Sequence, residues 1–366
     1  MPVSLRRDPD LTRAVIARWL AERFPGEGTP VVGPISTPAH TGFSGEILLC
    51  DAEWDHRGPH RVRPLAIRVA PTGHRLFPGD DWDRHTRLQA LLAGTDVPVA
   101  KIHGTEPTGE LLGVPFVVME RIPGDVPSDL PSYHHSGWLA RLPASARAEV
   151  WNGGLELMAK VHRLDPGTVD LSFLDKPSPE PAGIGRQLEE YAAHLTFYGA
   201  QDSPVVIRAL HWLRSHRPPE PDAPRLLWGD ARLANIICAG QTPVALLDWE
   251  MATLGAPECD LAWYLYTDRY MSEGRGLPRL AGLPDRQETV SRYASLLGRA
   301  MRHLPFYEVF AAFRFCLISS RFTRLMAGIG IQRPDNETPY ARSTALLDRL
   351  LGETDACVRQ GGTTVT

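Results

Sequence analysis

Apolar residues recur at helical spacing near the start of the chain and give way to short β-type runs. Asp10 is predicted to cap a first helix, Pro25 and Gly26 end it, and its apolar face is formed by Leu11, Val15, Ile16, Trp19, Leu20 and Phe24. Between 31 and 70 the runs VVGPI, EILLCDAEW and PLAIRVA are separated by turns that contain Gly or Pro. These runs predict a small antiparallel sheet.

The next part of the chain adds one helix and two strands to this sheet. The spacing is helical over 80–93, and the segments 97–102 and 113–122 have the composition of strands. Pro123 and Gly124 then break the pattern. Most of the remainder is predicted to be helical, over 145–164, 184–195, 203–216, 257–271, 287–303, 306–326 and 341–354. The runs RLLWGD and PVALLDWE interrupt the helices and are interpreted as a β-hairpin.

This order of elements predicts the α+β class and the two-lobed protein-kinase-like fold. Residues 1–121 form a small N-terminal lobe with five antiparallel strands and one helix, interpreted as the nucleotide-binding lobe. Residues 122–366 form a larger, mainly helical C-terminal lobe. A chain of 366 residues is too long for one compact core, which agrees with two lobes.

The charge balance excludes some partners. With 39 basic and 43 acidic residues the net charge is −4, so the chain lacks the polycationic surface that nucleic acid or an anionic membrane selects. No segment approaches the roughly 20 apolar residues needed to span a bilayer. We therefore expect no nucleic-acid partner and no membrane partner. The oligomeric state is not indicated.

Cysteine usage and the N-terminus indicate the compartment. Five scattered cysteines show no metal-binding spacing, which is typical of reduced thiols in a cytosol. Charged residues interrupt 11–24, so no secretory signal is expected. A transit peptide is the alternative suggested by five early arginines, but Asp8, Asp10 and Glu22 count against it. The expected localisation is cytoplasmic.

The segment from Leu226 to Leu265 contains the most informative polar residues. Asp230 and Asn235 lie on a loop that leaves one predicted strand and enters another, and Asp248 follows the next strand. Phosphoryl transfer needs a carboxylate to orient and deprotonate an acceptor hydroxyl, and oxygen ligands to hold Mg²⁺ against nucleotide phosphates. An isolated Asp and Asn in a loop would more often form a turn or cap. That explanation leaves Asp248 at the end of the second strand unexplained.

These motifs resemble a known family. GDARLAN, then LLDWEMATLG and DLAW, are similar to the aminoglycoside phosphotransferase-like superfamily, in the bacterial branch similar to the kinase-type domains found with acyl-CoA dehydrogenases. The resemblance implies an ATP- or GTP-dependent, Mg²⁺-dependent transfer of phosphate to a hydroxyl of a small molecule. It implies that Asp230 is the catalytic base and that Asn235 and Asp248 bind the metal.

The resemblance also bears on residues around this motif. Arg232, two positions beyond the base, is predicted either to stabilise charge on the transferring phosphoryl group or to fix the loop by a salt bridge. Asp260 is expected to brace the catalytic loop by accepting backbone N–H bonds. Trp228 stands where many relatives have a scaffold His.

Two features of the N-terminal lobe are candidate phosphate contacts. The loop Thr41–Gly45 can fold its backbone N–H groups over phosphates, with Ser44 adding a hydroxyl, although a hairpin turn has the same composition. Arg68 occupies the position where the fold usually presents a Lys to the phosphates, and a solvent-facing strand Arg is the alternative. The carboxylate expected to pair with Arg68 is not evident.

The run PFVVMERIPG is interpreted as the hinge. The backbone of Glu120 and Ile122 is predicted to pair with the adenine edge, with Met119 behind the base. For Met119, simple packing at the end of a strand is the competing explanation.

Other functional classes lack a site in the sequence. There is no GxSxG elbow, no HExxH and no GxxxxGK[ST] loop. A catalytically inactive nucleotide-binding pseudokinase or interaction module is the alternative to an enzyme, but the base and both metal ligands are present. A protein kinase is disfavoured because no DFG signature is present and the short connection between Asp248 and Asp260 leaves little room for an activation loop.

The sequence does not identify the acceptor. Antibiotics, hydroxyacyl thioesters, sugars and other alcohols all remain candidates. In 261–290 four carboxylates, Asp268, Glu273, Asp285 and Glu288, are balanced by Arg269, Arg275, Arg279 and Arg286. A polycationic acceptor needs an excess of carboxylates, so a neutral or anionic acceptor is predicted. Tyr133 and Trp138 are candidates for an aromatic wall, or simply pack on the lobe.

Overall fold

The computed structural model describes residues 7–38, 45–54, 61–71, 73, 75–79, 82–165, 167–175, 180–221 and 223–359. The chain divides into two compact units. Unit 1 comprises 1–76 and 80–123, and unit 2 comprises 77–79 and 124–366. The boundary predicted from the sequence lies at 121/122.

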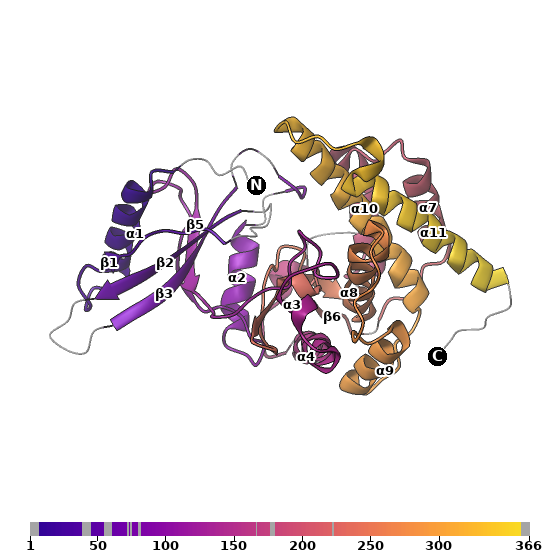
Figure 1. Cartoon of the computed structure of the whole chain (residues 1–366), viewed down its shortest axis with the longest axis horizontal. Helices are drawn as coiled ribbons and strands as arrows, with labels where there is room; N and C mark the ends of the chain where they lie inside the picture. The colour runs from indigo at the N-terminus through magenta and orange to yellow at the C-terminus, as the bar shows by residue number, and fades with distance from the viewer. Residues whose placement is uncertain are drawn as a thin grey trace. The chain divides into compact units, whose positions relative to one another are not determined.

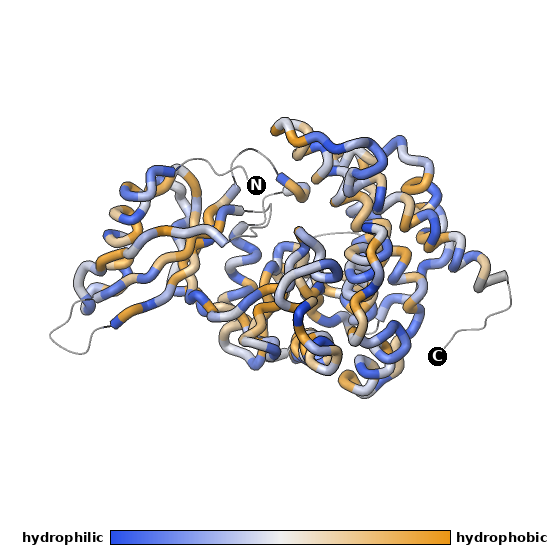
Figure 2. Tube along the Cα trace, viewed as in Figure 1, coloured by the Kyte–Doolittle hydropathy of each residue, from blue (hydrophilic) through white to orange (hydrophobic). Residues whose placement is uncertain are grey.

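Unit 1 is built on a five-stranded antiparallel sheet in the order β1-β2-β3-β5-β4 (Figure 1). Its elements are α1 (Pro9–Arg23), β1 (Val31–Val32), β2 (Glu46–Trp54), β3 (Arg61–Val69), α2 (Trp82–Leu92), β4 (Ile102–Glu106) and β5 (Phe116–Glu120). Hydrophobic and hydrophilic positions alternate along the strands (Figure 2). The apolar face of α1 packs on the sheet, where the rings of Trp19 and Phe116 meet edge to face at 5.6 Å.

Two predicted boundaries in unit 1 are wrong. The N-cap of α1 is Asp8, whose Oδ1 accepts the N–H groups of Asp10 and Leu11, because Pro9 fits the first turn and lacks an N–H. The fourth strand covers Ile102–Glu106, not 97–102. The apolar character of Val97 and Ala100 reflects burial in a segment outside any strand.

Unit 2 is mainly helical, as predicted. Its α-helices are α3 (Trp138–Arg141), α4 (Ala144–Arg163), α5 (Ile184–Ala193), α6 (Leu195–Tyr198), α7 (Pro204–Ser215), α8 (Glu258–Met271), α9 (Arg286–Leu297), α10 (Leu304–Gly328) and α11 (Pro339–Arg359). Short 3₁₀ turns lie at η1 (Ser172–Leu174), η2 (Leu233–Asn235), η3 (Glu273–Arg275) and η4 (Asp335–Glu337). The long helix α10 packs against α8, α11 and α7 (Figure 1).

The predicted hairpin in unit 2 is in fact two separate ladders. β6 (Arg225–Leu227) pairs with β9 (Thr253–Gly255), and β7 (Ile236–Ala239) pairs with β8 (Thr242–Leu246). The runs RLLWGD and PVALLDWE therefore do not pair with each other. The tight turn at Gly240 makes β7 and β8 neighbours, whereas β6 finds its partner after the chain has passed Asp248.

The cysteines agree with reduced, buried thiols. Cys50, Cys238, Cys259 and Cys316 are buried and form no disulfide, and the side chain of Cys357 lies outside the described residues. Burial raises the pKa of the Cys50 thiol to about 11 and that of Cys238 to about 12. These thiols are therefore poor nucleophiles. None of the described helices combines the length and apolar composition that crossing a membrane requires.

Candidate functional site: the catalytic loop of unit 2

The loop between β6 and β7 places Asp230 among three hydrogen-bond donors. The side-chain amide of Asn235 donates to Oδ2 at 2.7 Å and Nε of Arg232 donates to the same oxygen at 3.0 Å. The indole N–H of Trp263, on α8, donates to Oδ1 at 2.7 Å. The carboxylate is only 8% exposed. Since each carboxylate oxygen can accept two hydrogen bonds, Oδ1 keeps one acceptor position for a further proton donor.

Gly229, before Asp230, cannot be replaced without strain. Its φ is +89°, and a Cβ there would lie 2.0 Å from the carbonyl oxygen of Met251. Only glycine combines this conformation with this close approach. The glycine of the GDARLAN motif thus lets the chain pass next to β9.

The chain before Asp230 is held by the buried carboxylate of Asp260, at the start of α8. Its oxygens accept the backbone N–H of Trp228 at 2.6 Å and that of Gly229 at 3.0 Å. The predicted bracing role of Asp260 is confirmed. Trp228 is fully buried, and its indole N–H donates to the carbonyl of Leu247 at 2.7 Å, in keeping with a scaffold role.

A buried histidine that the sequence did not single out supports Asp260. Nε2 of His162, on α4, lies 2.9 Å from Oδ2 of Asp260, and the hydroxyl of Tyr293, on α9, contacts Nδ1 of the same ring. If Tyr293 donates to Nδ1, then Nε2 carries the proton and donates to Asp260. A usable signal existed, because His162 continues the apolar face of α4 formed by Leu155 and Met158.

Asp248 lies at the end of β8 in a conformation that is rare for its residue type. Its φ is +59°, in the left-handed region. The neighbouring Leu247 is fixed twice, by the bond from Trp228 and by its own N–H, which donates to the carbonyl of Asn235 at 2.8 Å. The structure therefore ties the segment before Asp248 to the catalytic loop. Strained backbone of this kind is typical of functional sites.

The pair Asn235 and Asp248 suits a hard cation. Both bonds that Asn235 donates use Nδ2, so its Oδ1 is left as an oxygen ligand, and Asp248 adds a carboxylate. In the part of the chain that the structure describes, no three His, Cys, Asp or Glu side chains gather as a metal cluster. Two oxygen ligands are enough to fit Mg²⁺, because this ion commonly takes its other ligands from phosphates and water.

Arg232 lies among several carboxylates. It contacts Asp129 through Nη1 and Asp230 through Nε. Burial disfavours its charge, but the carboxylates of Asp129, Asp230 and Asp248 together raise the pKa of Arg232 above its ordinary value. The salt bridge offered as one role for Arg232 is present, and its action on a phosphoryl group stays a prediction.

The other carboxylates considered for the acceptor have partners in unit 2. The side chain of Asp268 contacts those of Arg279, Tyr133 and His134. Burial alone would raise the pKa of Asp268, but the hydrogen bond from His134 and the cation of Arg279 lower it below its ordinary value. The remaining pairs join Glu273 to Arg269 and Arg349, and Asp285 to the first turn of α9 in a capping box with Glu288.

The predicted aromatic wall does not form as proposed. Tyr133 is 3% exposed, donates to Asp268 at 2.8 Å and packs against the ring of His134. It therefore belongs to the packing of unit 2, the alternative that the sequence left open. The indole of Trp138 donates to the carbonyl of Val126 at 3.2 Å and is partly exposed.

The predicted nucleotide contacts lie in unit 1. Arg68, in β3, pairs with Ile47 and Val117 in the sheet, and its guanidinium lies over the ring of Trp82 at 5.2 Å. The guanidinium of Arg68 thus makes a cation–π contact with the first residue of α2. Ser44 lies outside the described residues.

The hinge residues end β5. Met119 is partly buried and its sulfur accepts a weak bond from Gln89 at 3.5 Å, which fits its alternative role in packing. The backbone N–H of Glu120 already donates to Lys101 at 2.9 Å, so a contact from Glu120 to adenine would have to come from its carbonyl. Ile122 follows the strand, and its predicted contact stays a prediction.

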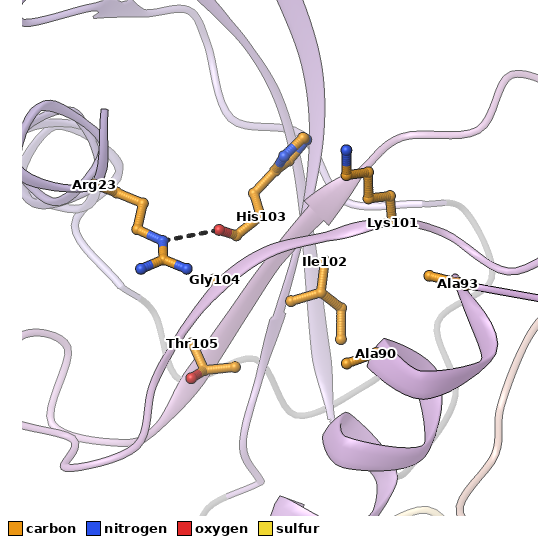
Figure 3. Close-up of a pocket in the computed structure, with 9 residues that line it drawn as sticks. Arg23, Ala90, Ala93, Lys101, Ile102, His103, Gly104 and Thr105 are labelled. Atoms are coloured by element: carbon orange, nitrogen blue, oxygen red, sulfur yellow. Dashed lines mark hydrogen bonds between the residues drawn. The ribbon is translucent and has the colours of Figure 1, made fainter. Parts of the chain in front are cut away.

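A pocket of about 480 Å³ also lies in unit 1, and no predicted site residue lines it (Figure 3). Arg23, at the end of α1, forms one side and donates through Nε to the carbonyl of His103 at 3.1 Å. Ala90 of α2 and Ala93, just after this helix, form the opposite side, and Ile102 lies between. Arg23 and Lys101 are exposed.

Curated relatives of the chain include acyl-CoA dehydrogenase family members. Member 10 of Mus musculus is 28% identical over 267 residues, covering 70% of this chain and 24% of the relative. Member 11 of Homo sapiens is 26% identical over 244 residues, covering 63% of this chain and 29% of the relative. The chain thus spans only about a quarter to a third of these relatives.

Solved structures share the fold. A putative aminoglycoside phosphotransferase from Ralstonia eutropha superposes with a TM-score of 0.67 at 22% identity, covering 92% of this chain and 98% of that one. A thermostable mutant of aminoglycoside phosphotransferase APH(4)-Ia, in a ternary complex with ADP and hygromycin B, gives 0.57 at 14% identity, covering 92% and 98%. The predicted α+β kinase-like fold is confirmed.

The match to a family covers more than half of the chain. The family described as "Phosphotransferase enzyme family" matches residues 61–296, a range that runs from β3 into α9 and contains the whole catalytic loop. The resemblance inferred from GDARLAN and LLDWEMATLG is confirmed, and the chain belongs to the phosphotransferase enzyme family.

Proposed function

We propose that the protein transfers the γ-phosphate of ATP or GTP to a hydroxyl of a small molecule, in a Mg²⁺-dependent reaction in which Asp230 is the catalytic base. The observation that carries the proposal is the hydrogen bonding of Asp230. Three donors fix its carboxylate, and Oδ1 still has one acceptor position for a hydroxyl proton.

Each residue of the loop has a distinct part in this proposal. Asp230 accepts a hydrogen bond from the acceptor hydroxyl and orients its oxygen toward the phosphoryl group. It takes the hydroxyl proton as the new P–O bond forms and the bond from the γ-phosphorus to the bridging oxygen breaks, which releases the nucleoside diphosphate. Asn235 holds Asp230 through Nδ2 and would offer Oδ1 to Mg²⁺, with Asp248 as the second ligand. When bound, the metal neutralises charge on the nucleotide phosphates. Arg232 supplies a further cation beside the base.

We further propose that the acceptor is neutral or anionic. Two similar structures are complexes with hygromycin B and kanamycin, but at 14% and 13% identity that likeness supports the fold alone. In this chain two carboxylates of unit 2 are neutralised internally, Asp268 by Arg279 and Asp129 by Arg232. A desolvated amine of a polycationic acceptor would therefore lack a partner there.

A substrate screen tests both proposals. Purified protein would be incubated with Mg·ATP or Mg·GTP and a panel of alcohols, sugars, hydroxyacyl thioesters, macrolides and aminoglycosides, and nucleoside diphosphate release and product mass would be measured. Acceptor-dependent release with a neutral or anionic hydroxyl compound supports the proposal. Turnover of kanamycin-like compounds alone would contradict the acceptor class, and nucleotide binding without transfer to any compound would favour the pseudokinase alternative.

A further inference from the structure

The long helix α10 buries a positive charge. Arg314 lies in the apolar run VFAAFRFCLI and is 2% exposed. No carboxylate among the described residues forms an ion pair with its guanidinium. Burial opposes its charge, but the surrounding groups, Tyr191, Cys259 and Asp260, raise the pKa of Arg314 above its ordinary value. Removing a cation from water is costly unless other contacts replace its hydration. An apolar side chain of similar size would fill this place without that cost, so packing alone does not account for Arg314.

The guanidinium is instead surrounded by aromatic rings and two acceptors. It lies 4.7 Å from the ring centroid of Trp263 and 5.4 Å from those of Tyr191 and Phe310. Nε donates to the hydroxyl of Tyr191 at 3.3 Å, and Nη2 donates to the carbonyl of Gly229 at 3.3 Å. Cation–π contacts of this kind are strongest when water is excluded.

Two of these contacts lead directly to the proposed base. Gly229 immediately precedes Asp230 in the chain, and Trp263 donates its indole N–H to Oδ1 of Asp230. Arg314 is therefore connected to Asp230 by two contacts, one with the backbone carbonyl of Gly229 and one with the side chain of Trp263.

The backbone before Asp230 is held from both sides. Asp260 accepts the N–H groups of Trp228 and Gly229, and Arg314 donates to the carbonyl of Gly229. Gly229 thus has a buried anion at its N–H and a buried cation at its carbonyl, on the two successive peptide groups that flank its Cα. A rotation of either peptide group would break a charge-assisted bond.

We propose that Arg314 is a positioning residue for the phosphotransfer site. It fixes the carbonyl of Gly229 and the indole of Trp263, and through them the orientation of the Asp230 carboxylate. This inference rests on the proposed function for its effect on turnover. Its structural part, the restraint of the loop, holds independently of the reaction.

The test compares Arg314→Met, which keeps size and removes charge and donors, with Arg314→Lys, which keeps the charge. Arg321→Met is the matched control, because Arg321 lies two turns further along α10 with its guanidinium 4.4 Å from the ring of Phe197, a residue outside the catalytic loop. Each variant would be checked for folding by thermal unfolding. Hydrogen exchange of the 225–236 amides would then be measured, together with Mg·ATP affinity and the rate of ADP release from Mg·ATP with water as acceptor.

In Arg314→Met we expect exchange in 225–236 to accelerate about tenfold or more while α4 and α9 are unchanged. ADP release should fall about 10- to 100-fold at nearly constant Mg·ATP affinity, because misorientation of a reacting group lowers the rate and not nucleotide binding. Arg314→Lys should lie between this variant and the wild type, and it carries the test if Arg314→Met does not fold.

Two results would overturn the proposal. One is wild-type exchange and wild-type turnover in a folded Arg314→Met, or in Arg314→Lys if Arg314→Met does not fold. The other is the same loss in Arg321→Met, which would indicate a general effect on α10. If the wild type releases ADP neither with water nor with any compound of the acceptor panel, the proposed function fails, and the exchange comparison alone then decides whether Arg314 restrains the loop.

Discussion

The sheet of unit 1 and the catalytic loop of unit 2 hold their candidate residues in place by different interactions. In the sheet, Arg68 and Met119 occupy positions in a backbone ladder, where Arg68 pairs with Val117 and Met119 pairs with Ala66. In the loop, strand β6 has only three residues, and Asp230 is positioned by side chains from the loop itself and from α8. Side-chain chemistry therefore defines the loop, whereas backbone pairing defines the sheet.

This difference indicates where single substitutions are expected to be most destabilising. A sheet position tolerates a side chain of similar volume because the ladder remains. A residue that supports the loop, such as Asp260 in α8, carries several hydrogen bonds at once, and removing it leaves its partners buried and unsatisfied. Single substitutions should thus be more damaging in the loop than in the sheet.

The largest expected effect on stability is that of Asp260→Asn. The variant loses a fully buried charge that accepts two backbone N–H groups and a histidine, and we expect the free energy of unfolding to fall by about 3–5 kcal/mol. Urea unfolding followed by circular dichroism measures this. The matched control in unit 1 is Asp51→Asn, which breaks a half-exposed ion pair with Arg121 and should cost less than about 1 kcal/mol. Equal losses in the two variants would remove the contrast between the regions.

Asp248→Ala should have a large effect on metal-dependent binding. Loss of a metal ligand should weaken nucleotide binding in Mg²⁺ by at least about tenfold, while binding in EDTA stays the same. Calorimetric titration of ATP with and without Mg²⁺ distinguishes the two conditions. If Mg²⁺ makes no difference to the wild type, Asp248 is not a metal ligand.

The smallest effect is expected in the sheet. Met119→Leu conserves volume at the end of β5, so the free energy of unfolding should change by less than about 1.5 kcal/mol. Nucleotide affinity, measured by the same calorimetry, should change less than about threefold. A much larger loss of affinity would show that the side chain of Met119 has a specific part in binding.

The two regions also differ in how far the sequence predicted them. In unit 1 the apolar stripe of the first helix and the alternation along β2 and β3 located these elements, because periodicity reports burial. Leu11, predicted on the apolar face of the helix, is nevertheless 64% exposed. The limits of β4 were missed because Val97 and Ala100 are buried without belonging to a strand. Local pattern does not separate these two causes of apolar character.

In the loop around Asp230 the sequence indicated the candidate site residues but not the residues that support them. Asp230, Asn235 and Asp248 were marked by their spacing around short strands. The pairing of β6 with β9 was missed, because three-residue strands carry too little pattern to specify a partner. His162 and Arg314 were missed because they reach the loop from α4 and α10 only through tertiary packing. Their one local signal is a polar residue in an apolar helical face.

The central claim is that Asp230 is the base in a phosphoryl transfer, and one measurement tests it most directly. Wild type and Asp230→Asn would be compared for transfer of radiolabelled γ-phosphate from ATP to an acceptor found in the screen, with Mg·ATP affinity measured on the same preparations. We predict that transfer falls by about 10²–10⁴-fold in Asp230→Asn while Mg·ATP binding is retained, since the base contacts the acceptor hydroxyl and not the nucleotide. Near-normal transfer in a folded Asp230→Asn variant would contradict the account.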